Sequence, residues 1–135
     1  MMNEPISSIM TTQLFTAAPG DSLNVVKEIL MKHRIHHVPV VDGKKLVGLV
    51  TTYDLFKRAF DPGAYQSLKV QDVMTTKLAT LEPSDKVGSA AEIFLEHLFH
   101  AVPIVKDGEL VGIITSFDVM KYEFRKAYPD HFSFT

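Results

Sequence analysis

The stretch GLVTTYD at residues 48–54 recurs as GIITSFD at residues 112–118. The same offset of 64 positions aligns residues 9–57 with residues 73–121 without a gap, and 20 of the 49 aligned pairs are identical. An internal repeat indicates a fold built from copies of one structural unit. A unit of this length buries too little surface to be stable alone, so we expect the two copies to share a core within one domain.

Each copy predicts the element order β-α-β-β-α. A short apolar strand is followed by apolar residues three and four positions apart, which is the spacing of one helix face. Two more strands flank an Asp-Gly pair, a strong hairpin signal, and a second helix begins after Thr51 or Thr115. The predicted segments are strands 14–17, 37–41 and 45–51 with a helix ending near Arg34 in the first copy, and strands 78–81, 101–105 and 109–115 with a helix ending near Leu98 in the second.

The boundaries of the repeats follow from the same pattern. Repeat 1 is predicted at residues 6–58 and repeat 2 at residues 70–125. Residues 59–69 hold Pro62-Gly63 and show no periodicity, so they are predicted as a linker. The segment after Lys121 is rich in aromatic residues, which either pack on the core or form a dimer contact; they are Tyr122, Phe124, Tyr128, Phe132 and Phe134.

The composition is that of an ordinary globular protein of 135 residues, with 46% hydrophobic and 22% charged residues. The sequence holds no apolar run of the ~18 residues that a membrane span needs, and its start does not resemble a signal peptide. A formal net charge of −2 offers no basic surface for nucleic acid, and the absence of cysteine excludes disulfides and thiolate chemistry. We therefore expect a cytoplasmic protein that binds no membrane and has no nucleic acid as its main partner.

The motifs Thr51-x-x-Asp54 and Thr115-x-x-Asp118 have two interpretations that do not exclude each other. The first is a capping box, in which the threonine and the acidic residue three positions on start a helix by reciprocal hydrogen bonds. The second is a nucleotide site, because backbone N–H groups and the positive end of the helix dipole attract anions at this place. A threonine hydroxyl can bind phosphate, and an aspartate carboxylate can accept hydrogen bonds from both hydroxyls of a ribose.

Two further sets of residues flank these motifs. Gly48 and Gly112 lack a Cβ, which we interpret as room for a ligand to lie against the strand. Lys57 and Arg58, with Lys121 at the matching position of repeat 2, follow the aspartates by three or four residues. They pair with the aspartates, remain solvated or reach a phosphate.

With the Met-Thr segments, the Val-Pro-Val-Val and Val-Pro-Ile-Val strands and the two motifs above, residues 6–125 resemble a pair of cystathionine-β-synthase (CBS) domains, also called a Bateman module. The resemblance implies an α+β fold in which two β-α-β-β-α units pack sheet to sheet with pseudo-twofold symmetry. Members commonly bind AMP, ADP, ATP, S-adenosylmethionine or related compounds in two clefts between the repeats, and pairs commonly form homodimers. Many relatives regulate an attached enzyme, transporter or channel. We expect this module to be free-standing, so the resemblance implies an unidentified protein partner.

The resemblance also assigns residues. Asp54 and Asp118 would bind ribose, and Thr51 and Thr115 would bind the junction of ribose and phosphate. The adenine would lie against the backbone near Thr16–Ala18 and Thr80–Glu82.

Histidines precede each Val-Pro strand. By resemblance to the gamma subunit of AMP-activated kinase, His36, His37 and His100 would face ligand phosphates. Ala101 stands where a second histidine would be in repeat 2, so we expect the two clefts to differ. Two alternatives remain: His36 and His100 bond only to backbone at a helix end, or the i, i+3 pairs His33-x-x-His36 and His97-x-x-His100 bind a metal. The second is disfavoured because no zinc-type set of Asp, Glu or Cys accompanies them.

No nucleophile elbow, Walker loop or zinc-protease motif is present, and the two aspartates lie in separate copies of the repeat. We therefore expect a regulatory module and not an enzyme, with no required cofactor and no metal. An adenine nucleotide or adenosyl compound would bind one or both clefts and change the conformation or the oligomeric state. The alternative is a ligand-independent dimerisation or scaffold module in which the two motifs are only helix caps.

Overall fold

The computed structural model describes residues 2–58, 63–97 and 99–130. The chain divides into two compact units, and each takes a short segment from the other repeat. The unit that we call the repeat-1 unit comprises Phe15–Leu78 and Gly108–Leu110, and the repeat-2 unit comprises Met1–Leu14, Ala79–Asp107 and Val111–Thr135. Both contain helices packed on an antiparallel hairpin, so the predicted α+β class is confirmed.

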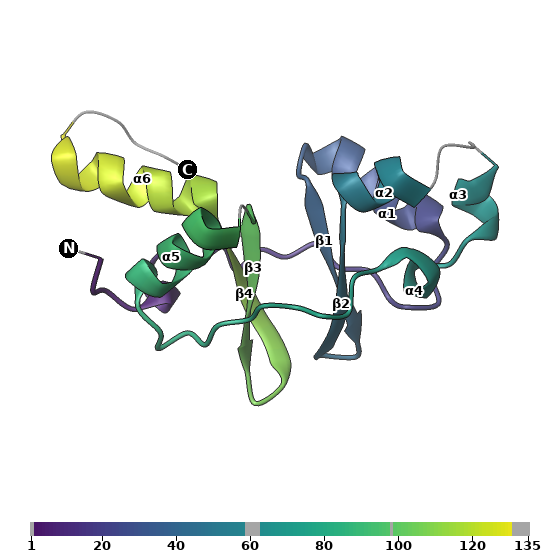
Figure 1. The fold of residues 1–135 in the computed structure, drawn as a ribbon, viewed down its shortest axis with the longest axis horizontal. Helices are drawn as coiled ribbons and strands as arrows, with labels where there is room; N and C mark the ends of the chain where they lie inside the picture. The colour runs from purple at the N-terminus through teal and green to yellow at the C-terminus, as the bar shows by residue number, and fades with distance from the viewer. Residues whose placement is uncertain (1, 59–62, 98, 131–135) are drawn as a thin grey trace. The chain divides into compact units, whose positions relative to one another are not determined.

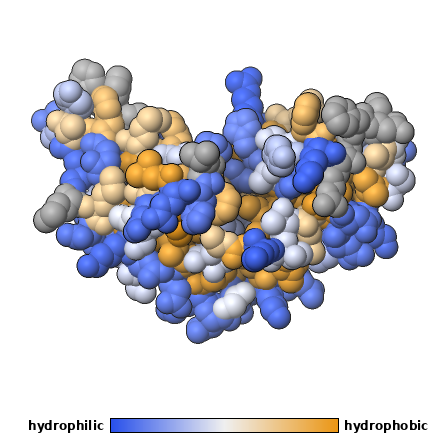
Figure 2. Space-filling view, in the orientation of Figure 1, coloured by the Kyte–Doolittle hydropathy of each residue, from blue (hydrophilic) through white to orange (hydrophobic). Residues whose placement is uncertain are grey.

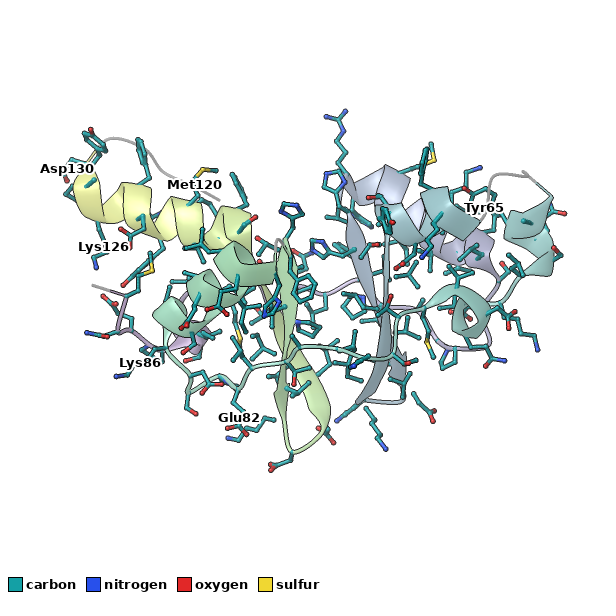
Figure 3. All side chains as sticks on the ribbon, viewed as in Figure 1. Tyr65, Glu82, Lys86, Met120, Lys126 and Asp130 are labelled. Carbon is teal, nitrogen blue, oxygen red and sulfur yellow. The ribbon has the colours of Figure 1, made fainter. Side chains whose placement is uncertain are left out.

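The repeat-1 unit holds one β-hairpin and four helices (Figure 1). Its elements are α1 (Leu23–His33), β1 (His37–Asp42), β2 (Lys45–Thr51), α2 (Thr52–Arg58), α3 (Ala64–Ser67) and α4 (Val70–Val73). The predicted linker 59–69 therefore contains a short helix, α3, while residues 59–62 lie outside the described residues. The ring of Tyr65 on α3 (labelled in Figure 3) has the Lys27 ammonium 5.0 Å from its centroid, which ties α3 to α1.

The repeat-2 unit repeats this arrangement with its own hairpin (Figure 1). Its elements are the 3₁₀ helix η1 (Ile6–Ser8), α5 (Val87–His97), β3 (Ala101–Lys106), β4 (Glu109–Thr115) and α6 (Ser116–Ala127). The first residues of β4 belong to the repeat-1 unit, where Glu109 pairs with Lys45 of β2. None of the described helices is long and apolar enough to cross a membrane.

The two hairpins turn through different residues. In repeat 1 the turn residues are Gly43 and Lys44, and Gly43 alone has a positive φ, of 65°. In repeat 2 both turn residues, Asp107 and Gly108, have positive φ, of 54° and 81°. A two-residue turn with positive φ at both positions favours Asp-Gly, whereas one with positive φ only at the first position needs glycine there. The Asp-Gly pair is therefore shifted by one position between the repeats while the loop keeps its length.

The prediction of a first strand in each repeat is wrong, because neither segment forms a continuous strand. Residues 14–17 and 78–81 contribute only single parallel bridges, Ala17 to Val40 and Leu81 to Ile104. Prolines limit this pairing, because Pro39 in β1 has no N–H to donate and Pro19 follows two residues after Ala17.

Each Met-Thr segment pairs with the last strand of the other repeat. Thr11 forms an antiparallel bridge with Ile113 of β4, and Thr75 forms one with Leu49 of β2. Each bridge has two backbone hydrogen bonds. Their N···O distances are 2.8 and 2.9 Å between Thr11 and Ile113, and 2.9 and 3.0 Å between Thr75 and Leu49. This exchange explains why each compact unit contains residues from both repeats.

The exchange also corrects the interpretation of the two motif glycines. A Cβ built on Gly112 would lie 2.6 Å from Sδ of Met10, and one built on Gly48 would lie 2.5 Å from Sδ of Met74. These distances are far below a van der Waals contact, so the glycines make room for methionines of the exchanged segments and not for a ligand.

Each unit has its own core. In the repeat-1 unit helix α1 packs Leu23, Val26 and Leu30 on the hairpin, together with Val70 and Val73 of α4. In the repeat-2 unit the buried cluster consists of Ile6, Ala90, Phe94, Val102, Ile104 and Ile114. Burial of one such side chain stabilises a fold by roughly 1.5–3 kcal/mol. Ile6 is fully buried and comes from the exchanged N-terminal segment, so that segment is part of the core.

The aromatic residues after Lys121 divide between core and surface. Tyr122 and Phe124 on α6 are half-buried, whereas Tyr128 is exposed. Phe132 and Phe134 lie outside the described residues.

Candidate functional site

Both Thr-x-x-Asp motifs form reciprocal caps at the start of a helix. At α6 the Asp118 N–H donates to Thr115 Oγ1 at 3.1 Å, and the Thr115 N–H donates to Asp118 Oδ2 at 2.9 Å. At α2 the Asp54 N–H donates to Thr51 Oγ1 at 3.2 Å, and the Thr51 N–H donates to Asp54 Oδ2 at 2.9 Å. The capping interpretation is thus confirmed for both copies, and the caps fix the carboxylates at the two helix N-termini.

Asp118 is held tightly. Its side chain is 5% exposed, and it is the one buried charged residue among those that the structure describes. The Thr11 hydroxyl, from the exchanged segment, lies 3.3 Å from both carboxylate oxygens. The Lys121 ammonium lies 3.5 Å from Oδ1. Asp118 therefore joins three segments of the repeat-2 unit: the N-terminal segment, the start of α6 and its second turn.

Asp54 has a looser environment. Its side chain is half-buried. The Thr51 hydroxyl donates to Oδ2 at 3.1 Å, and the Thr75 hydroxyl lies 3.5 Å from Oδ1, at the limit of a hydrogen bond. Lys57, the repeat-1 counterpart of Lys121, is exposed and makes no ion pair with any residue that the structure describes.

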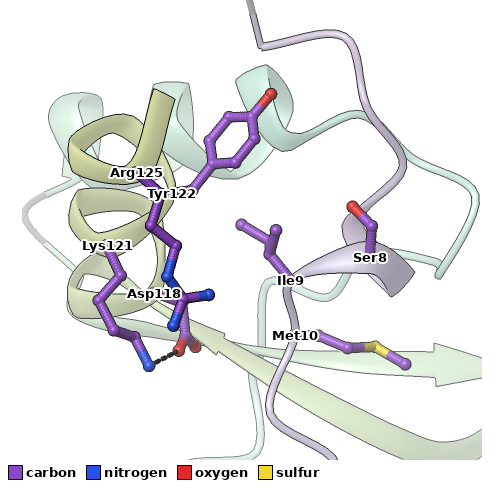
Figure 4. Close-up of a pocket in the computed structure, with 7 residues that line it drawn as sticks. All are labelled: Ser8, Ile9, Met10, Asp118, Lys121, Tyr122 and Arg125. Atoms are coloured by element: carbon purple, nitrogen blue, oxygen red, sulfur yellow. Dashed lines mark ion pairs between the residues drawn. The ribbon is translucent and has the colours of Figure 1, made fainter. Parts of the chain in front are cut away.

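A pocket of about 140 Å³ lies beside Asp118 (Figure 4). Figure 4 shows residues of the N-terminal segment on one side and residues of α6 on the other, with the Asp118–Lys121 ion pair dashed. The lining residues are Ser8, Ile9, Met10, Asp118, Lys121, Tyr122 and Arg125. The pocket thus combines two apolar side chains, an aromatic ring and three charged groups.

Tyr122, which lines the pocket, forms a polar cluster with Glu4 and Lys126. The Tyr122 hydroxyl donates to Glu4, and the Lys126 ammonium lies 3.9 Å from Glu4 and 3.5 Å from the Tyr122 oxygen. The bond from Tyr122 is the main cause that lowers the pKa of Glu4. Desolvation, followed by the bond to Glu4, raises the pKa of Tyr122. Glu4 is therefore ionised and Tyr122 neutral at pH 7, which keeps the N-terminal segment attached to α6 by a charge-assisted bond.

The backbone carbonyls of His36 and His100 accept hydrogen bonds from the first residues of α2 and α6. The carbonyl of His36 accepts from the Thr52 N–H at 2.9 Å, and the carbonyl of His100 accepts from the Ser116 N–H at 3.0 Å. Both side chains are exposed, and His37 is half-buried at the start of β1, opposite Thr51. Both contacts are made by backbone carbonyls and not by the imidazoles, so the alternative in which the His36 and His100 side chains bond only to backbone stays a prediction.

The metal alternative finds no support among the residues that the structure describes, which contain no group of three or more potential ligands. The ring of His33 stacks on Phe15 with centroids 3.6 Å apart, and His97 stacks on Phe99 at 5.5 Å.

Several predicted residues do not line the pocket. Thr16 and Thr80 are exposed residues next to the single bridges at Ala17 and Leu81. Five lining residues escaped the sequence argument: Ser8, Ile9, Met10, Tyr122 and Arg125. Met10 belongs to a repeated segment, but the repeat pattern alone does not say that this segment lies on the other repeat.

The family model of the CBS domain matches residues 6–61 and again residues 70–125. The chain is 28% identical over 114 residues to the CBS domain-containing protein YhcV of Bacillus subtilis, covering 84% of this chain and 81% of that protein. It spans only about a quarter of the inosine-5'-monophosphate dehydrogenases that it also matches (24%).

Two similar solved structures contain ligands. The structure of CBSX2 in complex with AMP matches with a TM-score of 0.82 and 28% identity, covering 91% of this chain and 98% of that one. The CBS domain pair of protein MJ0100, in complex with 5'-methylthioadenosine and S-adenosyl-L-methionine, matches with a TM-score of 0.80 and 29% identity, covering 92% and 98%.

Proposed function

The chain belongs to the CBS domain family, and from this premise we propose that it is a regulatory module that binds an adenosine-containing ligand. The observation that carries the proposal is the pocket of the repeat-2 unit, in which a buried carboxylate at a helix N-terminus adjoins apolar side chains. The ligands named for the two similar structures, AMP, S-adenosylmethionine and methylthioadenosine, share the adenosine part.

The residues suit the parts of such a ligand. In the repeat-2 unit the Asp118 carboxylate is the acceptor for ribose hydroxyls, and Ile9, Met10 and the Tyr122 ring offer a surface on which a purine base can pack. The Thr115 hydroxyl accepts from the Asp118 N–H, and its own hydrogen has no acceptor among the described residues, so it is available to the ligand. The exposed His100 side chain is proposed to face a phosphate.

In the repeat-1 unit the corresponding residues are Thr51 and Asp54, with His36 and His37 toward the phosphate. Thr16 and Thr80 stay predictions of the family resemblance.

We expect an adenosyl ligand to raise the melting temperature. A ligand at 100 times its dissociation constant adds about 2.7 kcal/mol to the free energy of unfolding, which corresponds to a rise of several degrees in a domain of this size. Thermal melts against AMP, ADP, ATP, S-adenosylmethionine and NAD measure this shift. No shift with any of the five at millimolar concentration would leave the scaffold alternative as the better account.

We further propose that the module acts as a homodimer. Each unit exposes three apolar side chains at repeat-equivalent positions, and such surface is typical of an interface. Figure 2 shows apolar surface (orange) interrupting the hydrophilic surface of both units, and Met120 projects from α6 in Figure 3. The pairs are Met31 and Leu95, Tyr53 and Phe117, and Phe56 and Met120.

A dimer built on these residues should dissociate when charge is placed among them. We expect Tyr53→Lys combined with Phe117→Lys to shift the protein from dimer to monomer in sedimentation velocity at micromolar concentration. The matched control is Gln66→Lys combined with Gln71→Lys, which adds the same charge at exposed positions elsewhere and should leave the dimer intact. A monomeric unmodified protein at 100 µM would contradict the dimer.

Signalling requires that the ligand bind one arrangement of the module more tightly than another. We propose that an unidentified partner protein recognises the favoured arrangement. The module itself would then be regulatory rather than catalytic.

A further inference from the structure

Four of the residues that line the pocket lie on one face of α6 (Figure 4). Asp118, Lys121, Tyr122 and Arg125 are three or four residues apart along the helix, which is the spacing of neighbours on one side. Exposure increases along this face, since Asp118 is 5% exposed, Lys121 is 26% exposed and Arg125 is an exposed residue. The pocket therefore has a buried carboxylate at one end and a guanidinium at its solvent end.

The lining of the pocket has an excess of positive charge. It contains two cations, Lys121 and Arg125, and one carboxylate, Asp118. The Lys121 ammonium lies 3.5 Å from Asp118 Oδ1, so one of the two cations already balances the carboxylate. Glu4 has the Lys126 ammonium 3.9 Å away, so this neighbouring pair adds no net charge. The lining thus favours a ligand that carries negative charge beside its ribose.

This charge balance is particular to repeat 2. The offset of 64 that relates the repeats places Asp72 at the position of Ser8 and Asp61 at the position of Arg125. In the sequence, the positions of repeat 1 that correspond to the lining residues hold three carboxylates and two cations, whereas the lining residues themselves hold one carboxylate and two cations. The net charge at these positions is therefore negative in repeat 1 and positive in repeat 2.

We propose that the pocket of the repeat-2 unit selects a nucleoside phosphate over an adenosyl sulfonium such as S-adenosylmethionine, and that Arg125 determines this choice. The proposal rests on the proposed function and adds the class of ligand. With the ribose on Asp118, the 5'-substituent of the ligand is one sugar ring away, and Lys121 and Arg125 follow Asp118 by about one and two turns of the helix. A guanidinium binds phosphate through two parallel hydrogen bonds. These two cations add to the phosphate contact proposed for His100.

Three adenosyl compounds distinguish the effect of charge, because they share adenine and ribose and differ in the 5'-substituent. The phosphate of AMP carries a charge of about −1.5 to −2 at pH 7, 5'-methylthioadenosine is neutral there, and S-adenosylmethionine carries a positive sulfonium. Solvent screens the exposed Arg125, so the preference is moderate. We expect AMP to bind about tenfold more tightly than methylthioadenosine, and S-adenosylmethionine to bind more weakly than either.

Isothermal titration of the full chain with each compound tests the selectivity. Arg125→Gln should reduce the preference for AMP over methylthioadenosine by about tenfold. The matched control is Lys106→Gln, which removes one positive charge from an exposed position of the same unit that does not line the pocket, and it should leave the preference unchanged. Added salt should weaken the binding of AMP more than that of methylthioadenosine, because salt screens charges. Thermal melts without ligand verify that each variant is folded.

A second variant changes the charge of the pocket and keeps Arg125. Ser8→Asp introduces the residue that repeat 1 has at the corresponding position, Asp72, and should also reduce the preference for AMP. Ser8→Asn has nearly the same shape without the charge and should reduce the preference less.

Four results would overturn the proposal and leave the adenosyl function in place: equal binding of AMP and methylthioadenosine, tighter binding of S-adenosylmethionine than of AMP, an unchanged preference in Arg125→Gln, or equal effects of Ser8→Asp and Ser8→Asn. Binding of none of the three compounds would overturn the proposed function, and this selectivity with it. The two failures are therefore distinguishable.

Discussion

Asp118→Ala should lower the free energy of unfolding by about 2–3 kcal/mol, and Asp54→Ala by about 1 kcal/mol. Loss of a helix cap costs about 1 kcal/mol in either case. Asp118→Ala also leaves the Thr11 hydroxyl and the Lys121 ammonium without their shared acceptor, which adds about 1–2 kcal/mol because Asp118 is buried. Equilibrium unfolding in urea, monitored by circular dichroism, measures both losses.

Asp118→Ala should also reduce the ligand-induced rise in melting temperature, because the proposed function assigns the ribose hydroxyls of the repeat-2 site to this carboxylate. Equal loss of stability in the two variants would show that the additional contacts of Asp118 with Thr11 and Lys121 contribute nothing. An unchanged ligand-induced rise in Asp118→Ala would contradict the assignment of Asp118 to the ribose.

Local patterns carried most of the sequence prediction. The Thr-x-x-Asp caps, the two hairpins and the amphipathic first helix of each repeat depend on residues close together in the chain, and the structure contains all of them. Even the one-position shift of the Asp-Gly pair was visible in the sequence, although its cause, a different pattern of positive φ, was not.

Features that depend on contacts between the repeats could not be predicted in the same way. The repeat pattern is identical whether a Met-Thr segment packs on its own repeat or on the other one. It therefore said nothing of the Thr11–Asp118 contact or of the side of the pocket formed by Ser8, Ile9 and Met10. The glycines were misread for the same reason, since the methionine that fills the space beside each one lies far away in the sequence.

Gly48→Ala should destabilise the repeat-1 unit by about 1–3 kcal/mol, because the new methyl group overpacks the strand against Met74. A Cβ at this position would lie 2.5 Å from Sδ, 2.9 Å from Cγ and 3.2 Å from Cβ of Met74. The sulfur can move by a change of rotamer, but the Met74 Cβ is fixed to the backbone, and Thr75 next to it pairs with Leu49 of β2. At Gly112 the three nearest atoms, Sδ, Cγ and Cε of Met10, all belong to the flexible end of the side chain, so Gly112→Ala should cost less.

A double-mutant cycle separates this overpacking from other effects of replacing a glycine. Met74→Ala creates the space that the Gly48→Ala methyl group needs, so the double variant should be more stable than the sum of the two single losses predicts. The control is Gly20→Ala, where a Cβ would meet nothing within 4 Å and the backbone is unstrained; we expect it to be neutral or slightly stabilising. Additive losses in the cycle would mean that Gly48 is required for a reason other than Met74, and the ligand interpretation of this glycine would return. A favourable coupling would instead establish that the glycine of this motif is retained for the exchange of segments between repeats, while ligand recognition rests on the threonine and aspartate that follow it.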